Sequence, residues 1–573
     1  MSKEPSSKSG ASEVDAERRK FLKSSGAAIA SGLAVPFMAG SDSAAAGAEG
    51  DENSAAEERV IHAEASKGTW HKPNIIILIN DMERFPMHWP EGWADANLPN
   101  HKRLAQHGLT FTSAFTAASM CTPSRGTIFT GLYPPEHGAI YTGSGVLNPS
   151  LQPSIPNMAT MLASAGYDVE YRGKWHLSKN AYGDQQITCG RDLEVFGFQG
   201  WQPPEAGLGS ACDGGGVDNY DEWYAAGAAD FLKSRKSSKP FALVVSLVNP
   251  HDISGYPGIS TQPEGGMWGA PSLSDQPPYK GTVNYGGVDL DASPLDQIQL
   301  PANFAAELYK PACQAESLAM WDVVGGPLST EEDQLHYARA YAYLHMVVDQ
   351  HIGTVLDALE SRRNLYRNTI IIRLTDHGDV AMSHGGMRQK AYCCYEEMFN
   401  IPLQIYNPVL FPKAVQTSAL ASSVDIMPTV ATIAGVPKKD IPTLRGVDLT
   451  PIIQDAIKHP PSPSATVRDS VFFTFDEMFL TEYFAGFITQ PAMIRCLRQK
   501  RWKIVMYYDP YGVAASVYEL YDLQDDPLEQ NNLGNPSNPN YNGAQLAIMQ
   551  QALQAMIVET HASLLTQSQI PVL

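Results

Sequence analysis

Three short, continuous apolar runs constrain the fold of this chain more than any other feature. They are residues 74–79 (NIIILI), 241–248 (FALVVSLV) and 369–374 (TIIIRL). None of them alternates cleanly between apolar and polar residues, so we expect strands that are buried on both faces. Strands of this kind are typical of a parallel sheet covered by helices on both sides.

Helical patterns lie between these runs. Residues 155–165 carry apolar residues at helical spacing, with Pro156 suited to a first turn. Ser329 and Glu332 form a capping-box pattern before a long helical segment that runs toward Leu359. Strands that alternate with helices predict a layered α/β domain, which we assign to residues 70–459.

The composition changes from about Pro460. Residues 471–475, 502–507 and 518–521 have the pattern of antiparallel strands, and a final helix is expected from about Gly543. We therefore predict a smaller α+β subdomain with an antiparallel sheet over residues 460–573. Residues 252–329 are too long for a simple connection and predict a functional loop or lid.

The N-terminal segment has the pattern of an export signal. Arg18 and Arg19 precede a mildly apolar stretch, residues 25–40, and then an Ala-rich stretch. This order is typical of twin-arginine signals. We predict a signal region (1–48), a flexible linker (49–69) and export to the periplasm or the medium through the twin-arginine translocase. A disordered basic tail is the alternative.

Charge and cysteine content limit the partners. The chain has 61 acidic and 41 basic residues, a formal net charge of -20, which would repel the phosphates of nucleic acid. Its seven cysteines are too few for a disulfide scaffold in 573 residues. Whether any of them pair stays open.

Each buried run ends in a polar cluster. The clusters are residues 80–81 (ND), 249–252 (NPHD) and 375–379 (TDHGD). Each cluster alone would be read as a turn. In open α/β sheets, however, ligands bind beyond the carboxyl ends of the strands, and two of these clusters combine Asp with His. Together they predict one shared site.

Residues 121–125 (CTPSR) are the most informative segment. Pro123 suits the first turn of a helix, which places Cys121 at the helix N-terminus. Amide donors and the helix dipole favour a negative atom at this position, so Cys121 could be a reactive thiolate. A small buried cysteine is the alternative.

The same segment resembles the signature of the sulfatase family of the alkaline phosphatase superfamily, in which the cysteine is converted to formylglycine. Residues 126–131 fit the continuation of that signature, but Leu132 stands where the family usually has arginine. Further similarities follow in family order between about Trp70 and Leu533: residues 173–177 (GKWHL), 249–251 (NPH), 375–379, 384–386 (HGG) with Lys390, and 519–523 (ELYDL) with residues 526–527.

The resemblance implies an alkaline phosphatase-like fold, with three α/β/α layers and a mostly parallel mixed sheet. It also implies hydrolysis of a sulfate monoester of a small molecule or glycan, after maturation by a formylglycine-generating enzyme. Cys121 would become an aldehyde that is hydrated to a diol. One hydroxyl attacks sulfur and the alcohol leaves; the other expels sulfate and regenerates the aldehyde.

A divalent cation would assist this chemistry. The resemblance implies that its ligands are Asp81, residue 121, Asp376 and His377. Carboxylates make Ca²⁺ the first expectation, while Mg²⁺ and the histidine-tolerant Mn²⁺ stay open.

The remaining roles also come from the resemblance. Arg125 would hold residue 121 and the metal ligands in place, and His251 would hydrogen-bond the sulfate or the leaving oxygen. Lys174 and Lys390 would offset the sulfate charge, with Lys390 a candidate acid for the leaving oxygen. His176 would act as the base in the elimination. Two lysines in one pocket are expected to lower each other's pKa.

Met82 departs from the family pattern, which commonly has aspartate or an amide after the first aspartate. A thioether is a poor ligand for a hard cation, so either the metal has one protein ligand fewer here, or another group such as Asn80 or water fills the place. Two alternative functions stay open. One is a phosphonate monoester or phosphodiester hydrolase, favoured by the pair Asp376 and His377, and the other is an exported binding protein without metal. Residues 200–224 and 255–285 are expected to shape the leaving-group pocket.

Overall fold

The structure is a computed structural model that describes residues 48–142, 150–178, 191–202, 220–256, 282–283, 288–305, 307–477 and 487–566. The predicted signal region, up to residue 47, and most of both expected pocket loops lie outside the described residues. Helix α2 (Ala48–Ala65) crosses from a first compact unit, Met1–Ala56, into a second, Glu57–Leu573. It occupies most of the segment expected to be a flexible linker, because its many Ala and Glu residues favour helix.

A seven-stranded sheet forms the centre of the second unit. Its strand order is β10-β2-β9-β8-β1-β5-β4, and β9 alone runs antiparallel to its two neighbours. The predicted mostly parallel mixed sheet is confirmed, with the three apolar runs as the adjacent strands β8, β1 and β5. The strand bounds are β1 Asn74–Asp81, β2 Gly108–Phe111, β4 Asp168–Gly173, β5 Phe241–Pro250, β8 Thr369–Thr375, β9 Leu403–Tyr406 and β10 Val415–Thr417.

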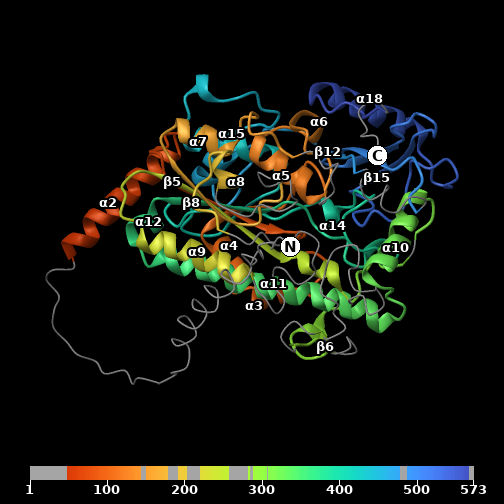
Figure 1. Cartoon of the computed structure of the whole chain (residues 1–573), viewed down its shortest axis with the longest axis horizontal. Helices are drawn as coiled ribbons and strands as arrows, with labels where there is room; N and C mark the ends of the chain where they lie inside the picture. The colour runs from red at the N-terminus through yellow and green to blue at the C-terminus, as the bar shows by residue number, and fades with distance from the viewer. Residues whose placement is uncertain are drawn as a thin grey trace, which may run out of the picture. The chain divides into compact units, whose positions relative to one another are not determined.

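Helices cover both faces of this sheet (Figure 1). Alternate residues of β1 point to opposite faces, so Ile75 and Ile77 pack in one core and Ile76 and Leu78 in the other. The first core includes helices α5 (Cys121–Thr130), α7 (Met158–Ser164), α15 (Ile426–Ile433) and α16 (Thr450–Lys458). The second includes α4 (Pro99–Gln106), α9 (Tyr220–Ser234) and α11 (Glu331–Glu360). The three-layer expectation is therefore confirmed.

Two helix starts differ from the sequence-based expectation by a residue or more. Helix α7 begins after the N-cap Asn157, whose side chain accepts from the amides of Ala159 and Thr160, so Pro156 precedes the helix. The capping box of α11 uses Thr330 and Asp333, one residue beyond the predicted pair. Adjacent Ser and Thr both suit an N-cap, and only the packing of the long helix selects between them.

The C-terminal region forms a separate antiparallel sheet of four strands in the order β12-β13-β14-β15. Its bounds are β12 Ser470–Phe475, β13 Met493–Gln499, β14 Trp502–Tyr508 and β15 Val517–Asp522, followed by α18 Gly543–Glu559. Strand β13 was not expected, because its two arginines break the apolar pattern. The boundary at residues 459 and 460 stays a prediction, since both sheets lie in one compact unit.

Shorter elements connect these layers. Helix α10 occupies part of the segment expected to be a loop or lid, so that segment is not loop throughout. None of the described helices is both long and apolar enough to cross a membrane. The remaining helices and strands are α3 Trp93–Asn97, β3 Ala114–Phe115, α6 Pro134–His137, α8 Arg191–Glu194, β6 Thr282–Val283, β7 Val288–Asp289, α10 Ala312–Gly325, α12 Arg363–Arg367, α13 Ser383–Gly386, α14 Glu396–Phe399 and β11 Ala421–Ser422.

Candidate active site

The three polar clusters meet because the strands that carry them are neighbours. In the sheet register Asn80 lies opposite Thr375, and Asp81 lies opposite Pro250. The carboxyl ends of β1, β5 and β8 therefore open onto one edge of the sheet. Both Asp81 and Asp376 are fully buried there.

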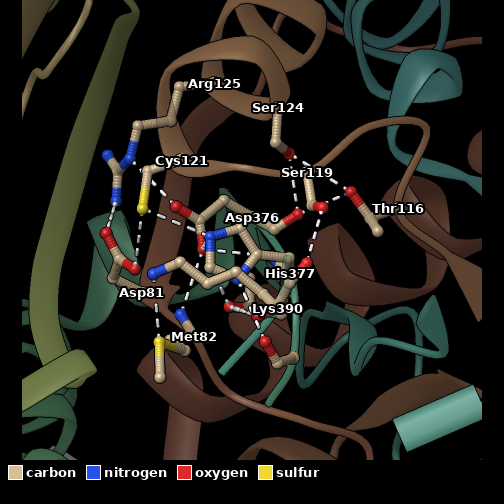
Figure 2. Close-up of polar contacts among 12 residues, drawn as sticks. Asp81, Met82, Thr116, Ser119, Cys121, Ser124, Arg125, Asp376, His377 and Lys390 are labelled. Carbon is tan, nitrogen blue, oxygen red and sulfur yellow. Dashed lines mark hydrogen bonds and ion pairs between the residues drawn. The ribbon is translucent and has the colours of Figure 1, made fainter. Parts of the chain in front are cut away.

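Helix α5 brings Cys121 to this edge. Cys121 is the first residue of the helix, after the N-cap Met120, and all ten residues of the helix are buried. The hydroxyl groups of Thr116 and Ser124 both donate to the backbone oxygen of Asp376, at 2.6 and 2.7 Å. These bonds fasten the start of α5 to the segment that follows β8 (Figure 2).

The four expected metal-binding residues come together. One potential ligand atom from each of Asp81, Cys121, Asp376 and His377 lies within 4.8 Å of the others. The Cys121 sulfur lies 3.6 Å from Asp81 Oδ1 and 3.2 Å from His377 Nε2. Two carboxylates and an imidazole at this spacing are donors that a divalent cation accepts, so the residues present fit a metal ion.

Arg125 joins both carboxylates. Its Nη2 lies 3.0 Å from Asp81 Oδ2, and its Nε lies 3.1 Å from Asp376 Oδ2. Its Nη1 donates to the Ser246 hydroxyl at 2.8 Å and to the Lys174 carbonyl at 3.0 Å. The guanidinium thus holds the ends of β1 and β8 at a fixed separation, as planar bidentate groups do.

Lys174, which directly follows β4, reaches the Asp81 carboxylate. Its Nζ lies 2.5 Å from Asp81 Oδ2. Burial lowers the pKa of Lys174, but Asp81, together with Cys121 and Asp376, outweighs burial and the net pKa is raised. The expected mutual lowering of lysine pKa values is therefore wrong for Lys174, because its nearest charge is a carboxylate. A Cβ on the preceding Gly173 would lie 1.9 Å from the backbone oxygen of Ser246, so only glycine allows this close approach of β4 to β5.

Burial and the nearest charges set the protonation states of the side chains at this site. Burial, helped by Asp81, raises the pKa of Cys121 to about 11, so the unmodified side chain stays a thiol at neutral pH. The expected reactive thiolate is therefore not favoured, despite the helix N-terminus. Burial also lowers the pKa of His176 and of His251 well below the usual range, and Lys174 adds to both effects. Both rings are neutral at pH 7 and could accept a proton.

Met82 and Asn80 do not complete the ligand set. The Met82 sulfur lies 3.2 Å from Lys390 Nζ (Figure 2). The Asn80 side chain donates to Glu83 Oε2 at 2.5 Å, so its amide is engaged by Glu83. The expectation that Asn80 replaces the missing ligand is therefore not supported.

Two positioning residues were not found from the sequence. Ser246, which binds Arg125, is the lone hydroxyl in the apolar run of β5, and that exception was the available signal. Asp221 accepts from the amides of Val248 and Asn249 at 2.6 and 2.9 Å and so holds the turn that presents His251. No local pattern marks Asp221, because its partners lie more than 20 residues away.

The chain is similar to known protein families and to individual proteins from several organisms. The family model described as Sulfatase matches residues 73–436, and the model described as N-sulphoglucosamine sulphohydrolase, C-terminal, matches residues 385–559. The choline-sulfatase of Rhizobium meliloti is 26% identical over 82% of this chain and 84% of its own length.

Among solved structures, a 2-O GAG sulfatase superposes with a TM-score of 0.61 at 21% identity, covering 86% of this chain and 93% of that one. The phosphonate monoester hydrolase of Agrobacterium radiobacter superposes with a TM-score of 0.58 at 19% identity, covering 86% and 95%. At these identities the two structures establish a shared fold.

Proposed function

The chain belongs to the sulfatase family and is a sulfuric ester hydrolase, and from this premise we propose that its nucleophile is formylglycine made from Cys121. One observation carries the proposal: Cys121 starts a buried helix within 4.8 Å of Asp81, Asp376 and His377. Conversion to the aldehyde replaces sulfur with oxygen. That exchange suits a pocket whose other donors are hard, and it removes a thiol that would stay protonated.

Asp81, Asp376, His377 and residue 121 would hold a divalent cation, with Ca²⁺ the first candidate and Mg²⁺ and Mn²⁺ the others. The ion would neutralise developing charge on the sulfate and favour the ionised nucleophile. Arg125 keeps the two carboxylates apart and oriented.

The cations and histidines have separate tasks. Lys174 and Lys390 would stabilise the sulfate, and Lys390 would donate a proton to the departing oxygen. Neutral His176 would take the proton from the second hydroxyl of hydrated residue 121, so that the bond from residue 121 to the sulfate oxygen breaks. His251 would donate a hydrogen bond to the substrate. Its Nδ1 is buried without a hydrogen-bond partner among the described residues, which supports a ligand there.

The mass of the peptide that contains residue 121 tests the nucleophile. We expect the native protein to yield an aldehyde peptide that reacts with a hydrazide probe. A Cys313→Ala variant, which removes another buried cysteine, is the control and should give the same aldehyde peptide. A free thiol at residue 121 in fully active enzyme would refute the proposal.

The pair of His377 and Asp376 supports phosphonate hydrolysis as the alternative function. Matched aryl sulfate and aryl phosphonate substrates distinguish the two functions. We expect the larger kcat/KM with the sulfate. A dominant phosphonate rate would assign the site to phosphorus instead.

For the natural substrate we propose a sulfated sugar. Support comes from the C-terminal family match, whose name is that of a sulphoglucosamine hydrolase, and from the structural likeness to a 2-O GAG sulfatase. Sulfate release from sulfated monosaccharides and from choline sulfate should favour the sugars. Equal or greater release from choline sulfate would count against this substrate class.

We also propose export through the twin-arginine translocase, supported by Arg18 and Arg19 before the weakly apolar stretch. That route carries folded proteins, so residue 121 could be converted before export. Changing both arginines to lysine should leave the protein in the cytoplasm. Unchanged export of that variant would contradict the proposal.

A further inference from the structure

A second group of buried charges lies in the loop that connects Asp376 to Lys390. At its centre is His384, whose ring stacks on Tyr395 with centroids 3.6 Å apart. Its Nδ1 lies 2.9 Å from Glu307 Oε1, and its Nε2 lies 3.1 Å from Glu397 Oε2. Because each ring nitrogen faces a carboxylate, the protonated ring can donate to both.

The loop around His384 is closed by its own hydrogen bonds. The amides of Val380 and Met382 donate to the carbonyls of Gln389 and Met387, at 3.0 and 2.7 Å. Asp379 accepts from the amides of Ala381 and Gln389, at 2.6 and 3.2 Å. The loop is therefore a hairpin, so a shift of its tip is passed along the chain to Lys390.

The tip of this hairpin is anchored from outside the loop. The amide of His384 donates to the carbonyl of Asn303 at 2.7 Å, and the amide of Gly385 donates to that of Phe304 at 3.0 Å. His384 itself has a φ of 55°, in the left-handed region that side chains other than glycine rarely adopt. This conformation needs support from its surroundings, and the paired side chain supplies it.

Glu397 also contacts the loop after β1, the strand that carries the metal-binding residue Asp81. Its Oε1 accepts from His88 Nε2 and from Asn303 Nδ2, both at 2.8 Å. His88 belongs to the loop after β1, which carries Asp81. One carboxylate therefore ties the loop after β1 to the loop after β8.

The charges around His384 favour an ion pair over a metal ion. Burial lowers the pKa of His384, but Glu397 and Glu307 outweigh it and raise the pKa to about 9. Lys310, which contacts Glu307 and Tyr395, lies 3.5 Å from Nδ1 and opposes them in part. Glu529 also faces the ring but is paired with Lys503 at 2.8 Å. A metal would need a neutral ring and a free carboxylate, so the protonated ring is the better match.

We propose that His384 and Glu397 form a positioning brace that fixes Lys390 and Asp376 relative to Asp81. The proposal rests on the role of Lys390 in the proposed function. Neither residue of the brace touches the reacting atoms. Each acts by holding the backbone of a loop that carries a catalytic or metal-binding side chain.

The test is the pH profile of kcat for an aryl sulfate, measured on metal-loaded enzyme. In the wild type we expect activity to fall as the pH rises through about 9, where His384 loses its proton. Glu397→Gln keeps the shape but removes one charge, so the fall should begin at lower pH. His384→Gln should lower kcat about tenfold with KM changed less than twofold, because a catalytic group is misplaced.

His459→Gln is the matched control, since that imidazole is exposed at the C-terminal end of α16 and pairs with Asp455. It should leave the profile unchanged. An identical alkaline fall in Glu397→Gln and wild type would overturn the brace.

Titration of His384 in the wild type by NMR gives a readout that does not depend on activity. A pKa near the unperturbed value of about 6.5 would also overturn the brace, even if the variants fail to fold. If the enzyme prefers phosphonates, the same profile on an aryl phosphonate tests the brace while the sulfatase proposal fails separately.

Discussion

The edge of the central sheet and the C-terminal sheet both bury charged side chains, yet only the first is a candidate active site. In the C-terminal sheet, Arg495 uses every nitrogen: its guanidinium binds Asp476 at 2.6 Å and the carbonyls of Ile494, Ala562 and Ser563. Arg125, equally buried, also uses its nitrogens, but it binds two carboxylates that face a third group, Cys121.

The two regions differ in the groups that surround their buried charged side chains. The carboxylate Glu519 on β15 accepts from the hydroxyls of Tyr507 and Tyr521 in the same sheet and of Tyr395 outside it, at 2.8–3.0 Å. At the sheet edge, the ring nitrogen Nδ1 of His251 has no hydrogen-bond partner among the described residues. Buried charge alone therefore does not identify a site. At the sheet edge, the meeting of two carboxylates, an imidazole and the Cys121 sulfur does.

The largest expected effect on activity comes from replacing one cysteine in each region. Cys121→Ala should abolish turnover, by at least about 10⁴-fold, because it removes the covalent nucleophile. The control is Cys496→Ala on β13, which should cost about 1 kcal/mol of stability and leave kcat unchanged. Steady-state kinetics and thermal unfolding measure both. Substantial activity in Cys121→Ala would contradict the assignment of the active site to the edge of the central sheet.

A second pair of variants compares the buried arginines. Arg125→Lys and Arg495→Lys should each cost about 3 kcal/mol of unfolding free energy, because one lysine ammonium cannot reach all the groups that the guanidinium binds. Arg125→Lys alone should also weaken metal binding, measured by calorimetry on metal-free protein. If Arg495→Lys weakened metal binding equally, the two regions would not be functionally distinct.

A smaller effect, on metal affinity, is expected when Met82 at the sheet edge is replaced. Met82→Asp should raise the affinity for Ca²⁺ about tenfold, since it adds a hard oxygen ligand beside Asp81. Met82→Leu is the control and should leave the affinity unchanged, because the thioether contributes no ligand. Unchanged Ca²⁺ affinity in Met82→Asp would show that another group already occupies the ligand position.

The smallest effect concerns α11, which supports the edge through Tyr341, whose hydroxyl donates to the Met82 carbonyl at 2.6 Å. Thr330→Ala should cost about 1 kcal/mol of stability through loss of the N-cap, with catalysis unchanged. Ser329→Ala should have almost no effect, although the sequence pattern favours it as the cap. A larger loss in Ser329→Ala would reverse the capping assignment; chemical denaturation measures both.

The apolar runs predicted β1, β5 and β8, three of the strands around the site, but not β4, which directly precedes Lys174. These three strands formed from residues 74–79, 241–248 and 369–374, because apolar runs rich in β-branched residues suit a strand that is buried on both faces. Strand β13 was missed for the opposite reason. Arg495 looks like a surface residue in the sequence, and its partner Asp476 directly follows the neighbouring strand β12.

Within the site, the sequence by itself determined which side chains could act. It placed Cys121 at a helix start, and it placed Asp81, His251, Asp376 and His377 after buried strands, since these features depend on local order along the chain. The tertiary structure alone decided their charges and supports. The raised pKa of Lys174, the contacts of Ser246 and Asp221, and the pairing of His384 with Glu307 and Glu397 depend on groups distant in sequence. Electrostatic energy depends on distance in space, and chain order does not specify it.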